Sequence, residues 1–85
     1  PNLKEHDAVT DVGAGTGMFS SLLLEHMPSL QLTIVEPSTP MLAIAKKRLG
    51  DSVKYLDGTI DAALPLLAKQ DAFIFQRSLY AIYQS

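Results

Sequence analysis

The sequence contains no cysteine, and this absence excludes a disulfide scaffold, a thiolate nucleophile and a cysteine-ligated metal. Positive charge is also scarce, because seven Lys and Arg stand against nine Asp and Glu, for a formal net charge of −2. The only basic cluster is Lys46-Lys47-Arg48, so there is no electrostatic footprint for nucleic acid. No apolar run approaches the roughly 18–20 residues that span a bilayer, and no signal-peptide pattern is present. We therefore expect a soluble, cytoplasmic domain without a metal site.

Strand-like and helix-like segments alternate along the chain, which predicts an α/β fold with a parallel sheet. Strands are expected at 7–12, 30–35, 52–56 and 71–75, and helices at 17–27, after a cap at Ser38 or Thr39 as far as Gly50, and at 61–69. Pro65 must lie in the first turn of the last helix or break it.

Two of these segments carry predictions about burial. The first helix has Phe19, Leu22, Leu23 and Met27 at the spacing that places apolar side chains on one face. The unbroken apolar run 72–75 suits a strand that is covered on both faces.

The most informative segment is the glycine-rich turn Asp11-Val12-Gly13-Ala14-Gly15-Thr16-Gly17, which directly follows the apolar run 8–10. A second apolar run, 30–35, ends at an acid, Glu36, and Pro37 holds that acid extended. A strand, a glycine turn that opens a helix and a strand followed by a carboxylate form a nucleoside-binding unit. The glycines let the backbone approach the ligand, and the carboxylate accepts hydrogen bonds from ribose hydroxyls. A tight turn alone would not require three alternating glycines.

The glycine spacing distinguishes two nucleoside cofactors. The dinucleotide fingerprint reads G-x-G-x-x-G, but Met18 stands in place of its third glycine and the pattern here is D-x-G-x-G-x-G. This pattern resembles the first motif of the class I S-adenosylmethionine-dependent methyltransferases, and the segment 36–45 resembles the second region of that family. The resemblance implies a three-layer Rossmann-like fold with strand order 3-2-1-4 and S-adenosylmethionine as cofactor. An NAD(P)-binding oxidoreductase domain and a non-catalytic nucleoside-binding module remain the alternatives.

The resemblance also implies roles for individual residues at the carboxyl ends of the strands. The methionine part of the cofactor would lie over the glycine turn, Glu36 would bind the ribose, and Asp11 would organise the turn or bind through water. Met41 either fills the core or flanks the adenine. The expected cofactor-binding residues are Asp11, Gly13, Ala14, Gly15, Gly17, Glu36, Pro37, Met41, Thr59, Ile60 and Gln76.

The adenine-binding segment departs from the family pattern. Members of the family often have G-D-x after the third strand, whereas Asp57 here precedes Gly58 and Thr59 follows it. Either the register shifts by a residue or two, or Thr59 and the backbone of Ile60 contact the ring. A turn and a helix cap are an equally good interpretation of Asp57 and of Asp61.

The segment after the fourth strand bears on the methyl acceptor. Its sequence Gln76-Arg77-Ser78-Leu79-Tyr80 lacks the N-P-P-Y-like motif of many amine methyltransferases, which argues against an adenine or glutamine amide nitrogen as acceptor. It is more similar to family members that act on small molecules, in which a polar residue near Gln76 lines the pocket. Arg77 and Tyr80 either touch the substrate or lie at the surface, and no residue is assigned a catalytic role.

The number of strands predicts an incomplete domain. The resembled enzymes have seven strands, and 85 residues leave room for four, so we expect the chain to be the cofactor-binding half of a longer protein. The fourth strand would then be an exposed sheet edge, which favours self-association.

Overall fold

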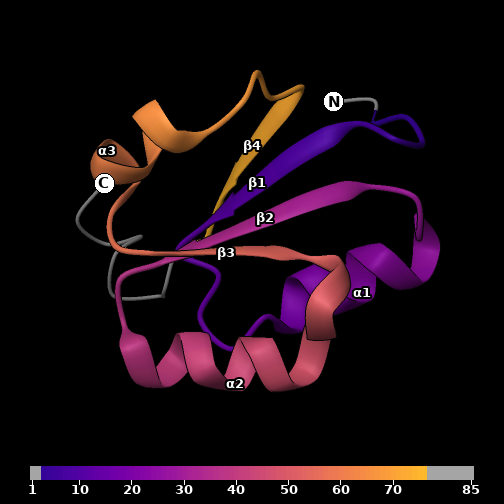
Figure 1. The fold of residues 1–85 in the computed structure, drawn as a ribbon. Helices are drawn as coiled ribbons and strands as arrows, with labels where there is room; N and C mark the ends of the chain where they lie inside the picture. Colours follow the sequence, from indigo (N-terminus) through magenta and orange to yellow (C-terminus); the bar gives the residue numbers. More distant parts are fainter. Residues whose placement is uncertain (1–2, 77–85) are drawn as a thin grey trace.

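A computed structural model describes residues 3–76 (Figure 1). Four parallel strands form one sheet in the order β3-β2-β1-β4. The strands are β1 (Ala8–Val12), β2 (Gln31–Glu36), β3 (Lys54–Asp57) and β4 (Ala72–Phe75). The helices are α1 (Met18–His26), α2 (Thr39–Leu49) and α3 (Ile60–Ala63), with short 3-10 turns η1 (Gly50–Ser52) and η2 (Leu64–Leu66). The predicted α/β class and strand order are confirmed. Arg77 and Tyr80 lie outside the described residues.

The helices form layers on the two faces of the sheet. Figure 1 shows α1 and α2 together on one face and α3 on the other. This arrangement follows from right-handed crossovers, because the chain moves outward from β1 to β3 on one face and returns to β4 across the other. The main core lies between the sheet and the helix layer formed by α1 and α2. Its buried members are Val9, Leu30, Leu32, Ile34, Leu42 and Val53.

The ends of α2 agree with the sequence signals. Ser38 is the N-cap, and its hydroxyl accepts a hydrogen bond from the Met41 N–H at 3.4 Å. At the other end Gly50 has φ of 76°, and its N–H donates to the Lys46 carbonyl. The third helix is shorter than predicted. Pro65 occupies the first turn of a 3-10 segment, and because proline has no N–H, α3 stops at Ala63 and η2 follows.

The prediction about the buried face of α1 is wrong for two of its four residues. Phe19 and Leu22 are exposed, Leu22 by 50%, whereas Leu23 and Met27 pack against the core. The residue that α1 buries completely is Ser20. Its hydroxyl donates to the buried Asp11 carboxylate, so the orientation of the helix is fixed by a polar contact that hydrophobic periodicity does not report.

Strand β4 is covered on one face only within the described chain, so the prediction of burial on both faces is wrong there. Ile74 packs against the core, whereas Phe73 and Phe75 point the other way and stack on each other with ring centroids 6.4 Å apart. Phe75 is 61% exposed. Among the described strands β4 pairs only with β1, so the prediction that it forms a sheet edge is confirmed.

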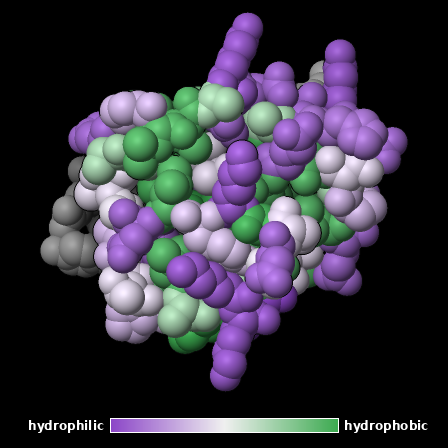
Figure 2. Space-filling view, viewed as in Figure 1, coloured by the Kyte–Doolittle hydropathy of each residue, from purple (hydrophilic) through white to green (hydrophobic). Residues whose placement is uncertain are grey.

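The surface is hydrophobic around α3 and η2, on the face of the sheet opposite α1 and α2. Figure 2 shows apolar residues gathered over the region where Figure 1 places α3 and η2. η2 contributes the exposed side chains of Leu64 and Leu66. Within residues 3–76, no helix is long and apolar enough to cross a membrane.

Candidate functional site

Three predicted elements of the site converge at the carboxyl end of the sheet. The glycine loop (residues 13–17) follows β1, Glu36 ends β2, and Gln76 follows β4. Because β1 lies between β2 and β4 and the crossovers leave it on opposite faces, this point is the topological switch of the sheet. Open α/β sheets bind their ligands at such a point.

The glycines of the loop serve different purposes. A Cβ atom on Gly17 would lie 3.0 Å from the Leu49 side chain and 3.3 Å from Cβ of Ala45, so this glycine allows α1 to start against α2. A Cβ atom on Gly15 would meet nothing within 4 Å. Both residues have positive φ, which side chains rarely adopt. Gly15 is therefore the position at which the loop backbone is open to a ligand.

Glu36 is joined directly to this open position. One carboxylate oxygen accepts the Gly15 N–H at 2.6 Å and the other accepts the Ser38 N–H at 2.9 Å. The residue is 6% exposed, so its charge is held close to the loop. Since a carboxylate offers about four acceptor sites, two backbone donors leave capacity for ligand hydroxyls. The glycine loop and the acid, 21 residues apart in the sequence, form one unit.

Asp11 lies beneath the loop and has no exposed surface. Its carboxylate accepts the Ser20 hydroxyl at 2.5 Å and the side-chain amide of Gln76 at 3.0 Å. Burial raises the pKa of Asp11 above its ordinary value of 3.8, the charge of Glu36 adds to this rise, and the two hydrogen bonds oppose it. The carboxylate ties β1, α1 and the end of β4 together, which favours the organising role over direct ligand contact.

Two residues of this site were not predicted from the sequence. Ser20 is one, and its signal was a polar residue among the apolar residues of α1. Arg48 is the other: its guanidinium Nη1 donates to the carbonyl oxygen of Thr16 at 2.9 Å and to the Thr16 hydroxyl at 3.0 Å. In the sequence Arg48 is one of three basic residues at the end of α2. No local pattern indicates its contact with Thr16, which is 32 residues away.

The other predicted site residues from the first half of the chain lie around the same carboxyl end of the sheet. Met41 is 43% exposed on the first turn of α2, so of its two interpretations the core filler is wrong. Pro37 is exposed next to Glu36. Ala14 packs against the core, and its carbonyl accepts the Gly17 N–H at 3.1 Å, so Ala14 shapes the loop from within.

The segment expected near the adenine is anchored to β2. Asp57 lies beside Glu36 in the register of β2 and β3, and the Gly58 N–H donates to the Glu36 carbonyl at 3.2 Å. The Thr59 hydroxyl caps α3 by accepting the Ala62 N–H at 3.4 Å, and Ile60 begins that helix. The segment therefore lies beside the end of β2, with its one hydroxyl engaged in a helix cap.

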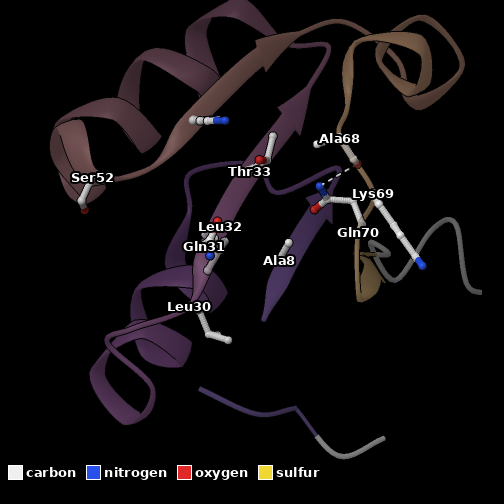
Figure 3. A pocket seen from close by; sticks show the side chains of 10 residues that line it. Ala8, Leu30, Gln31, Leu32, Thr33, Ser52, Ala68, Lys69 and Gln70 are labelled. Atoms are coloured by element: carbon white, nitrogen blue, oxygen red, sulfur yellow. Dashed lines mark hydrogen bonds between the residues drawn. The ribbon is translucent and has the colours of Figure 1, made fainter. Parts of the chain in front are cut away.

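A cavity of about 340 Å³ lies elsewhere, between the amino-terminal halves of β1 and β2 and the segment 68–70 (Figure 3). None of the predicted site residues lines it. One of its polar lining side chains, Gln70, donates to the Ala68 carbonyl at 3.0 Å and accepts the Thr10 hydroxyl at 2.8 Å. The described residues also include no group of three or more His, Cys, Asp or Glu that could hold a metal ion.

Comparison with known proteins agrees with this geometry. Residues 9–84 match a family model described as a methyltransferase domain. Malonyl-[acyl-carrier protein] O-methyltransferase 1 of Ilyobacter polytropus is 37% identical over 49 residues, which are 58% of this chain and 18% of that protein. The chain spans about a fifth of the length of the curated relatives it matches.

Solved methyltransferase structures share the fold, among them the following two. The plantazolicin methyltransferase BamL, in complex with a triazolic desmethylPZN analog and SAH, has a TM-score of 0.72 at 25% identity, over 82% of this chain and 26% of that one. A putative methyltransferase from an antibiotic biosynthesis pathway of Anabaena variabilis has a TM-score of 0.71 at 27% identity, over 94% of this chain and 31% of that one. The chain thus belongs to the methyltransferase domain family, with the Rossmann-like fold of the class I S-adenosylmethionine-dependent enzymes.

Proposed function

We propose that this chain binds S-adenosylmethionine at the glycine loop and Glu36, as the cofactor-binding part of a methyltransferase that acts on a small-molecule acceptor. The observation that carries the proposal is the hydrogen bond from the Gly15 N–H to the Glu36 carboxylate at the switch point of the sheet. It brings an open stretch of backbone and a ribose acceptor to one place, as a nucleoside site requires.

The residues around this bond fit the polar groups of the cofactor. The free acceptor capacity of Glu36 suits the two ribose hydroxyls, and its charge would repel a 2′-phosphate. Helix α1 starts at Gly17 without a side-chain cap and has no acidic residue in its first turn, which suits the methionine carboxylate. The exposed thioether of Met41 suits contact with an aromatic ring such as adenine.

The protein's own contribution to methyl transfer is to bind and orient. The sulfonium of the cofactor supplies an activated methyl group, so the fold provides position, alignment and exclusion of water. No residue between 3 and 76 is given the role of general base. The small-molecule acceptor is supported by the absence of an N-P-P-Y-like motif after β4 and by a structural neighbour named for plantazolicin. The curated relatives are named for a malonyl group on a carrier protein, which is a carrier-bound acceptor.

Calorimetric titration of the intact protein tests the proposal. We expect saturable binding of S-adenosylmethionine and of its demethylated product, S-adenosylhomocysteine (SAH), and weaker binding of NAD. Tighter binding of NAD than of either methionine-derived ligand would contradict the proposal and favour an oxidoreductase domain. Cofactor binding without transfer to any acceptor would favour a non-catalytic module.

A further inference from the structure

The glycine loop is held by two helix-to-loop contacts in addition to Glu36. Arg48, in the last turn of α2, reaches Thr16 with one guanidinium nitrogen that donates to both the carbonyl and the hydroxyl oxygen. One residue further along, Gly17 lies against Ala45 and Leu49 of the same helix. The carboxyl-terminal face of α2 therefore contacts residues 16–17, while Glu36 holds Gly15.

We propose that Arg48 is a positioning residue for the cofactor: it fixes the glycine loop in its ligand-binding shape by holding Thr16. The proposal rests on the proposed function, because it assigns the loop to the cofactor. Arg48 itself touches no cofactor atom in this scheme and acts through the backbone of the loop.

The start of α1 explains why such a contact is needed. Helices are commonly fixed at their first turn by a Ser, Thr, Asp or Asn side chain at the N-cap. Here the N-cap is Gly17, which has no side chain, has φ of 80° and makes no capping hydrogen bond. Three glycines in five residues add backbone freedom that must be lost when a ligand binds. The contact from Arg48 removes part of that freedom before binding.

The chemistry of Arg48 suits this role better than compensation of the helix dipole. Lys46, Lys47 and Arg48 all lie in the last turn of α2, so any of them meets the dipole. Only arginine presents a planar, always charged set of donors, and a charge-assisted bond to a carbonyl is stronger and more directional than a neutral one. Lys46 is engaged elsewhere, with its ammonium 5.8 Å from the centre of the Tyr55 ring.

Lys47 provides a matched control, because Lys47→Met removes the same charge from the same helix turn. In the intact protein we expect Arg48→Met to raise the Kd for SAH about 10-fold and Lys47→Met to leave it unchanged. The KM for S-adenosylmethionine should rise with kcat unchanged, since the loop is ordered once the cofactor saturates it. Arg48→Lys should recover part of the loss, and Thr16→Val, which keeps the carbonyl acceptor, should lose about threefold.

The outcomes separate the two proposals. Equal SAH affinity for Arg48→Met and Lys47→Met would overturn the positioning role while the proposed function stands. If Arg48→Met lowers the melting temperature and Thr16→Val binds SAH with wild-type affinity, Arg48 is a purely structural residue. This result would also overturn the positioning role. Failure of the wild-type protein to bind SAH would instead contradict the proposed function.

Discussion

Replacement of Glu36 by alanine removes one side of the hydrogen-bonded unit that joins the loop to β2. Two backbone donors, the N–H groups of Gly15 and Ser38, lose their acceptor. The loop around Gly15 is only half-buried, so water replaces the carboxylate there. We expect the fold to survive with a loss of about 1–2 kcal/mol in the free energy of unfolding.

The effect of Glu36→Ala on the cofactor should be larger than its effect on stability. Each hydrogen bond to a charged group contributes about 1.5–3 kcal/mol, and two such bonds to ribose hydroxyls are not additive, so we expect a loss of about 2–4 kcal/mol in binding. At 1.4 kcal/mol per factor of ten, the Kd for SAH should rise about 30- to 700-fold.

Calorimetry with SAH and urea unfolding of the same samples measure the two effects of Glu36→Ala. Glu25→Ala is the control, because it removes the same charge from an exposed position on α1 and should change neither quantity. An unchanged Kd with an intact fold would show that the ribose is held elsewhere and would refute the assignment of Glu36.

Three further predictions concern the surroundings of the site. Gly17→Ala should lower the free energy of unfolding by at least about 1–2 kcal/mol, because φ is positive and the new Cβ would lie 3.0 Å from Leu49; a variant as stable as wild type in urea unfolding would contradict this. Burial raises the pKa of Asp11 above 3.8, so the folded state holds the proton more tightly and the stability contributed by this group falls as pH rises through the raised pKa. The stability of Asp11→Asn relative to wild type should therefore increase in urea unfolding as the pH rises from about 4 through the raised pKa, and a decrease would have the wrong sign. Residues 1–85 in isolation should associate through the β4 edge and methylate nothing. In sedimentation, Phe75→Glu should reduce the association more than the control Phe19→Glu, which adds the same charge on α1. Equal effects of the two variants, or robust turnover by residues 1–85, would count against this interpretation.

The sequence predicted the fold because its signals were local and mutually consistent. The glycine turn, the Ser38 cap and the Gly50 stop each mark an element boundary by a backbone requirement that a few residues satisfy. The approach of Glu36 to the glycine loop was also predictable, since parallel strands bring their carboxyl ends to one edge. The strand order came from the family resemblance.

The parts that could not be predicted depend on tertiary polar contacts. Hydrophobic spacing placed Phe19 and Leu22 inward, but a buried hydrogen bond between Ser20 and Asp11 determines which face of α1 meets the sheet. The contact of Arg48 with Thr16 joins distant segments and has no local signature. The exposure of Phe73 and Phe75 depends on which elements cover their face of β4. A run of apolar residues does not predict which elements those are.

Nuclear magnetic resonance of the backbone amides during titration with SAH tests the central claim most directly. The N–H groups of Gly15 and Ser38 donate to the Glu36 carboxylate, so they report any ligand hydroxyl that joins the same acceptor. Both signals should shift saturably with SAH in the intact protein, with one shared Kd, and should shift less with NAD at the same concentration. SAH binding that leaves both signals unmoved would contradict a cofactor site built on the glycine loop and Glu36.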